Sequence, residues 1–215
     1  RPGGWWSPGE WTVVCYDTRT SSGTLDQMLM ALFHEASHQF MSLLDKGGGA
    51  PSWLNEGTAT FFEGATAMAD HRVLWPDAAR SRLQSLVAML GRGTGPSVAE
   101  VIGYSEPGSY APEYYPFGWG LVYFMQQYED PETLEYVLRP SYAEYRDRIT
   151  TRGGDSRQVF DEVFLRRGAP GDFASFEDFA ARWERWIRED VWPLYFGRDR
   201  RERRGARIER YVAAA

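Results

Sequence analysis

Two of the three histidines in the chain lie four residues apart, in the stretch HEASH at residues 34–38. On an α-helix, residues four apart project from the same face, one turn from each other. His34 and His38 can therefore direct two imidazole nitrogens at one point, as a tetrahedral zinc ion requires. Glu35 projects about 100° round the helix from His34, where it can accept a proton from a water molecule that the metal activates. The pattern predicts two zinc ligands and a general base, and the plain alternative is an amphipathic helix with this spacing by chance.

A third protein ligand is needed, because a catalytic zinc site combines three such ligands with an open position. Glu56 is the candidate, and residues 39–55, which include a Gly-rich stretch, separate it from His38. That length allows one helix to end and a second helix to return beside it. Considered alone, Glu56 could equally be a surface glutamate near a helix N-terminus, where the helix dipole favours negative charge.

Helices must position these residues. Apolar residues recur at helical spacing from Leu25 to Phe40, and Thr24 with Gln27 forms a capping-box pattern that predicts the start of this helix. The run Gly47–Gly49 predicts its end. A second helix is predicted from Ser52 through the segment WLNEGTATFFEGATAM, which ends at residue 68.

The rest of the chain predicts a small β element and further helices. The Trp pair at 5–6 and the stretch WTVVCY at 11–16 flank a Ser-Pro-Gly turn, which is typical of a hairpin. Downstream we expect a helix after Pro76, a loop at 91–112, helices at 117–128, 156–167 and 176–191, and a helical stretch from 130 that Pro140 interrupts. The expected fold class is α+β and predominantly helical, with a small N-terminal β-sheet or hairpin and an active-site helix.

Composition excludes several classes of protein. A hydrophobic fraction of 43% over 215 residues is ordinary globular composition and predicts a single domain, 1–215. The net charge of -6 gives no reason to expect nucleic-acid binding, and no apolar run reaches the length of a membrane span. The only cysteine, Cys15, excludes an internal disulfide and a Cys-based zinc site, and is expected to pack in a strand. The chain begins without Met, which favours removal of a leader and a secreted, periplasmic or cell-surface location.

HEASH followed by NEG at residues 55–57 resembles the gluzincin metallopeptidases. The resemblance is closest to small bacterial peptidase MA-like domains and more distant to aminopeptidase N type and thermolysin-like enzymes. It implies a zincin-like metalloprotease fold, a bound Zn²⁺ and Glu56 as the third ligand, although the connection is slightly shorter than is usual in that family. It also implies that the strand in WTVVCYD pairs with an extended substrate.

The resemblance extends to a tyrosine and covers residues 11–128. Tyr115, followed by Gly118 and an apolar helix, is similar to the aminopeptidase-type pattern, which implies a phenol that donates a hydrogen bond to the developing oxyanion. An aromatic core patch is the alternative, and Tyr110 and Tyr114 are the other candidates for the role. Glu63 follows Glu56 by seven residues on the same helix face, so it either orients a metal-bound imidazole or lies at the surface.

Other family features are missing. We find neither a GAMEN-like segment, which aminopeptidases use to hold a free amino end, nor a downstream histidine of the thermolysin type. The spare histidine, His71, is expected to be solvated near a helix end. The Arg-rich tail at 197–210 is expected to be a solvated helix or tail.

The leading hypothesis is zinc-dependent hydrolysis of a peptide or protein substrate. Under this hypothesis the single domain has three parts: the strands and active-site helix (1–50), the third-ligand helix and Tyr-bearing segment (51–128) and a helical C-terminal part (129–215). One alternative is a catalytically inactive metal-binding or protein-interaction domain on the same fold. Another is a helical interaction module without a metal.

Overall fold

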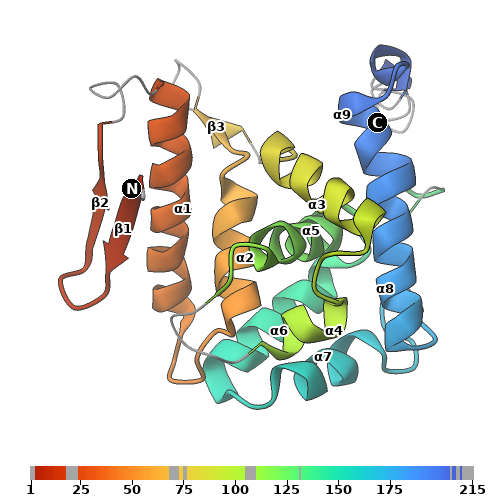
Figure 1. Ribbon diagram of the computed structural model, residues 1–215. Helices are drawn as coiled ribbons and strands as arrows, with labels where there is room; N and C mark the ends of the chain where they lie inside the picture. The colour runs from red at the N-terminus through yellow and green to blue at the C-terminus, as the bar shows by residue number, and fades with distance from the viewer. Residues whose placement is uncertain are drawn as a thin grey trace.

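The structure, a computed structural model, is predominantly helical with a small N-terminal antiparallel sheet, which confirms the α+β expectation (Figure 1). It describes residues 3–17, 24–67, 73–74, 77–104, 110–130, 132–203, 205–206 and 209. The strands are β1 (Gly4–Ser7), β2 (Thr12–Cys15), β3 (Thr66–Ala67) and β4 (Val73–Leu74). The helices are α1 (Leu25–Leu44), α2 (Ser52–Phe62), α3 (Arg80–Arg92), α4 (Val98–Gly103), α5 (Tyr114–Gln127), α6 (Arg139–Arg152), α7 (Ser156–Phe164), α8 (Phe176–Arg185), the π-helix η2 (Trp186–Val191) and α9 (Trp192–Phe196).

The predicted hairpin is present and lies against α1. Strands β1 and β2 pair antiparallel, with Gly4 opposite Cys15. The indole Nε1 of Trp6 donates a hydrogen bond of 3.2 Å to Oγ of Ser42 on α1. Both strands contact α1 on one side, and α2 contacts it on another, so α1 lies between the hairpin and α2 (Figure 1).

Helix α1 begins and ends where its sequence predicts. Thr24 Oγ1 accepts from the Gln27 backbone N–H at 3.3 Å, and Gln27 Oε1 accepts from the Thr24 N–H at 2.9 Å, which completes the capping box. After Leu44 the side chain of Asp45 accepts hydrogen bonds from the backbone N–H groups of Gly47 and Gly49, so the chain turns sharply toward α2.

Helix α2 is shorter than the sequence pattern predicts and ends at Phe62 rather than near residue 68. The reason is a tight turn, in which the Gly64 N–H bonds to the Phe61 carbonyl at 3.2 Å. The Asp77 carbonyl oxygen lies only 2.1 Å from the place that a Cβ on Gly64 would occupy, so no other residue fits there without a shift of the backbone. Glu63 consequently is the C-cap residue of α2 and directly follows Phe62, the last residue of the helix.

Helix α5 forms the centre of the core and packs on α2 through two glycines. Most of its residues are buried, including Trp119 and Phe124, which have no exposed surface. A Cβ on Gly57 would lie 2.6 Å from the Gly118 carbonyl oxygen and 3.0 Å from Cγ2 of Val122. The two backbones can approach this closely only because Gly57 lacks a side chain, and the approach brings the N-terminal part of α5 to α2.

Replacing Gly57 by alanine is expected to lower the free energy of unfolding by about 2 kcal/mol, because the new methyl group meets backbone atoms that cannot move independently. The same change at Gly91 of α3, where nothing lies within 4 Å of the new Cβ, is expected to raise it by about 0.5–1 kcal/mol. Urea denaturation of both variants measures the difference. Equal effects at the two positions would contradict the close α2–α5 contact.

Two predictions for the later part of the chain are wrong. The expected loop at 91–112 contains the end of α3 and all of α4, whose start is fixed by a capping box between Ser97 and Glu100. Pro140 does not interrupt a helix but lies in the first turn of α6, where its missing N–H costs nothing. Ser175 caps α8, where its Oγ accepts a hydrogen bond from the Asp178 backbone N–H at 3.2 Å. The helix expected after Pro76 is present as α3 and begins at Arg80. His71 and part of the Arg-rich tail lie outside the described residues.

Candidate metal centre

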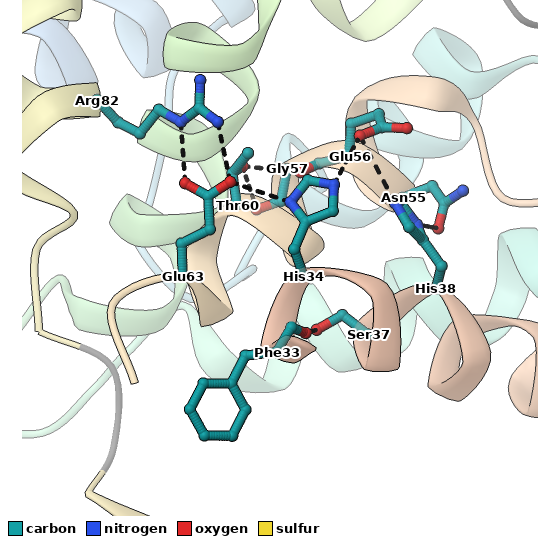
Figure 2. Close-up of polar contacts among 10 residues, drawn as sticks. All are labelled: Phe33, His34, Ser37, His38, Asn55, Glu56, Gly57, Thr60, Glu63 and Arg82. Carbon is teal, nitrogen blue, oxygen red and sulfur yellow. Dashed lines mark hydrogen bonds and ion pairs between the residues drawn. The ribbon is translucent and has the colours of Figure 1, made fainter. Parts of the chain in front are cut away.

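Helices α1 and α2 bring His34, His38 and Glu56 to one point (Figure 2). Oε2 of Glu56 lies 3.6 Å from Nε2 of His34 and 3.8 Å from Nε2 of His38, and one potential ligand atom from each residue lies within 4.8 Å of the others. Two ligand atoms on a tetrahedral zinc ion with bonds of about 2.0–2.1 Å are about 3.3 Å apart. The residues predicted to be metal ligands are thus adjacent and close to the required spacing.

The other nitrogen of each imidazole faces an oxygen acceptor. Nδ1 of His34 lies 3.0 Å from Oε1 of Glu63, and Nδ1 of His38 lies 3.0 Å from Oδ1 of Asn55 (Figure 2). A carboxylate or amide oxygen can only accept, so both Nδ1 atoms carry the proton. In the neutral form of each ring, the lone pair on Nε2 is therefore directed at the common point, which is the tautomer that metal binding requires.

Glu63 is in turn held by an arginine on α3. Arg82 donates from Nε to Oε2 of Glu63 at 3.0 Å and from Nη2 to Oε1 at 2.9 Å. Only 9% of the Glu63 side chain is exposed, so the ion pair is largely shielded from water. Burial acts to raise the pKa of this carboxyl, but its bonds with His34 and Arg82 outweigh burial and hold the pKa below its usual value.

The electrostatics of the site favour a positive charge at His34. Burial is the largest single influence on this imidazole and by itself lowers its pKa. The adjacent carboxylates of Glu56 and Glu63 together outweigh burial and raise the pKa to about 9. Two carboxylates on opposite sides of one ring thus stabilise a cation there, whether a proton or a metal ion carries the charge.

A buried oxygen of Glu56 provides an independent test of whether a metal fits. Oε2 is inaccessible to solvent and has no hydrogen-bond partner among the described residues. A buried carboxylate oxygen without a partner is costly, and buried charges in proteins are normally paired or bind metals. This oxygen, which makes no hydrogen bond, is the one that faces both Nε2 atoms, so the residues present fit a cation with two nitrogen ligands and one oxygen ligand.

Glu35, the predicted general base, lies on α1 beside the hairpin. A Cβ on Gly4 would approach Cγ of Glu35 to 3.1 Å, so β1 passes directly over this side chain. Its charge reaches Cys15 and Tyr115: burial first and Glu35 second raise the pKa of the Cys15 thiol, and Glu35 also contributes to the raised pKa of Tyr115. The raised pKa keeps Cys15 a neutral thiol, in agreement with a packing role.

Tyr115 is the tyrosine for which an interaction with a candidate ligand, Glu56, is indicated. It lies in the first turn of α5 and interacts with the carboxylate of Glu56; burial first, and then Glu56, raise its pKa to about 12. The phenol is therefore protonated at neutral pH and can donate a hydrogen bond. Tyr110 instead donates its hydroxyl to the Tyr114 carbonyl at 3.2 Å, and burial raises its pKa further. Glu56 contributes to the raised pKa of both tyrosines, and because the Tyr110 hydroxyl already donates to the Tyr114 carbonyl, Tyr115 is the stronger candidate of the three.

Comparison with known proteins gives no relatives. No family model matches the chain, and no curated protein or solved structure is significantly similar to it. None of the helices in the described parts of the chain combines the length and apolar character that crossing a lipid bilayer requires.

Sequence reasoning missed two members of the site, Asn55 and Arg82. Asn55 immediately precedes Glu56 on α2, and this position could have indicated its contact with the imidazole of His38. Arg82 follows Glu63 by 19 residues across a turn and part of a new helix, and no local spacing rule connects the two.

Proposed function

We propose that this chain is a zinc-dependent peptidase of the gluzincin type with a zincin-like fold. The observation that carries the proposal is the convergence of His34 Nε2, His38 Nε2 and Glu56 Oε2 on one point, with a glutamate next in sequence to the first histidine. Two imidazoles and one carboxylate are a ligand set of catalytic zinc in peptidases. The resemblance to gluzincins rests on these motif residues.

The metal would be held by His34, His38 and Glu56, and the fixed Nδ1 protons of both histidines would keep their rings oriented. When bound, zinc lowers the pKa of a water molecule and polarises a carbonyl group. Glu35 accepts a proton from the attacking water as the C–O bond forms, and delivers that proton to the amide nitrogen as the C–N bond breaks. The proton that Glu35 takes from water is the one that it gives to the amide nitrogen, so atoms and charge balance. Glu35 ends the reaction as a carboxylate, as it began.

Tyr115 would stabilise the negative charge that develops on the carbonyl oxygen. Its pKa of about 12 means that it donates a proton in a hydrogen bond without giving it up. The hairpin supplies the extended backbone along which a peptide can pair, since β1 and β2 have only each other as partners among the described strands. These features favour a peptide over other carbonyl substrates.

A peptide library incubated with purified protein tests the proposal. We expect zinc at one equivalent per chain, cleavage of a subset of peptides, loss of cleavage on addition of a chelator, and recovery when zinc is restored. Stoichiometric zinc without cleavage of any peptide would favour a metal-binding domain without catalysis. Protein that binds no zinc would contradict the metal centre itself.

Replacing Tyr115 by phenylalanine is expected to lower kcat by about 10²-fold, because one hydrogen bond to the oxyanion is lost in the transition state. Zinc affinity should stay within about threefold, since the hydroxyl is not a ligand in the proposed site. Tyr110→Phe is the matched control and should retain most activity, because that hydroxyl bonds to the backbone of Tyr114. A larger loss with Tyr110→Phe than with Tyr115→Phe would reverse the assignment.

A further inference from the structure

Arg82 contacts the site from a third helix without facing the convergence point. It belongs to α3, and its side chain is 30% exposed, which leaves the guanidinium largely covered. Both oxygens of Glu63 accept hydrogen bonds from it, and one of these oxygens, Oε1, also accepts from His34 Nδ1 (Figure 2). The chain of contacts therefore runs from α3 through the end of α2 to the metal face of α1.

The two-point contact between Arg82 and Glu63 restricts the carboxylate more than a single bond would. A guanidinium is a rigid planar fork, so two parallel N–H···O bonds fix both the position and the plane of the carboxylate. A fixed Oε1 in turn fixes the direction of the Nδ1–H bond of His34 and hence the direction of the lone pair on Nε2. A lysine at position 82 would supply the charge without fixing the plane.

The guanidinium is itself held from the opposite side. Its Cζ lies 5.5 Å from the ring centroid of Tyr115, within the range of a cation–π contact. Tyr115 interacts with Glu56, and Glu56 faces His34. Four side chains from α1, α2, α3 and α5 are thus linked by contacts in the order His34–Glu63–Arg82–Tyr115 along one side of the site.

We propose that Arg82 is a positioning residue that sets the orientation of His34 through Glu63 and thereby sets the affinity of the site for its metal. The inference rests on the proposed function, because it requires that His34 bind a metal. It assigns to α3, which supplies no ligand, a direct part in metal affinity.

Zinc affinity, measured by competition with a chromophoric chelator, tests the inference without any assay of catalysis. We expect Arg82→Gln to weaken zinc binding about tenfold, Glu63→Gln to weaken it about tenfold or more, and Arg82→Lys to weaken it about threefold. In the Glu63→Gln background, Arg82→Gln should have an effect of less than about twofold, because its route to His34 is already broken. The visible absorption spectrum of Co²⁺-loaded protein should change in Arg82→Gln, since it reports ligand geometry.

Controls separate this effect from general destabilisation. Arg80→Gln, two residues earlier on α3 at an exposed position, removes the same charge and should leave zinc affinity and the Co²⁺ spectrum unchanged. Arg82→Gln removes the cationic partner of the largely buried Glu63 carboxylate, which can prevent folding. The double variant Glu63→Gln, Arg82→Gln removes that carboxylate as well, and Arg82→Lys keeps a positive charge opposite it. If Arg82→Gln does not fold, the inference is tested by Arg82→Lys alone, for which we expect zinc binding about threefold weaker than in wild type.

Three results would overturn the inference: unchanged affinity in both Arg82 variants, an equal loss in Arg80→Gln, or a tenfold loss for Arg82→Gln that persists in the Glu63→Gln background. Zinc affinity that depends on Arg82 in a protein that cleaves no peptide would overturn the proposed catalysis and support this inference. Wild-type protein that binds no zinc would overturn both.

Discussion

Glu35→Gln is expected to lower the rate of peptide cleavage by about 10²–10⁴-fold while the protein keeps its zinc. Glutamine has nearly the same shape as glutamate but cannot accept a proton from water at neutral pH. Glu35 is not among the three residues whose ligand atoms converge, so the metal centre should remain intact. The measurements are kcat on a peptide identified from the library and the zinc content of the same preparation.

Asp26→Asn is a suitable control for that experiment, because it removes one carboxylate from the first turn of the same helix, far from the convergence point. It should leave kcat unchanged within about twofold. Full turnover in Glu35→Gln would remove Glu35 from the mechanism. A joint loss of activity and zinc would show instead that Glu35 supports metal binding.

The second large effect is expected for Glu56→Gln, which removes the only carboxylate ligand of the proposed centre. The charge that offsets the metal disappears, and a neutral amide oxygen is a much poorer zinc ligand. Wild-type protein should be stabilised by about 4 kcal/mol at a free zinc concentration a thousandfold above its Kd, and this stabilisation should be nearly absent in the variant. Unfolding curves with zinc and with chelator measure the difference.

Glu10→Gln, at an exposed position in the turn of the hairpin, provides the matched charge change. It should retain the full effect of zinc on stability. Zinc stabilisation equal to that of wild type would show that Glu56 is not a ligand.

The candidate ligands could be predicted from sequence because they depend on local geometry. His34 and His38 share a helix face by spacing alone, and Glu56 and Glu63 share a face of the next helix for the same reason. The start of α1 was predictable from Thr24 and Gln27, since a capping box involves only backbone and side chains within one turn. Features that depend on residues four to seven positions apart could therefore be predicted from residue spacing alone.

The contacts that hold the ligands depend on packing between helices and could not be read from spacing. Arg82 meets Glu63 only because α3 crosses the end of α2, and that crossing depends on the turn at Gly64. The Gly57–Gly118 approach, which brings Tyr115 to the site, joins residues 61 positions apart. The capping box at Ser97 and Glu100 is different: its signal was present in the sequence, and a Gly- and Pro-rich surrounding obscured it.

The short connection between α1 and α2 has a consequence for how the protein assembles. All three convergent residues lie on consecutive helices joined by residues 45–51, so bringing them together closes only a small loop. Loop-closure entropy grows with loop length, and contacts between near neighbours in sequence form faster than distant ones. Tyr115 and Arg82 must arrive from later segments. During folding, the three convergent residues on α1 and α2 are therefore expected to meet first. Arg82 and Tyr115 are expected to join them later, as α3 and α5 dock.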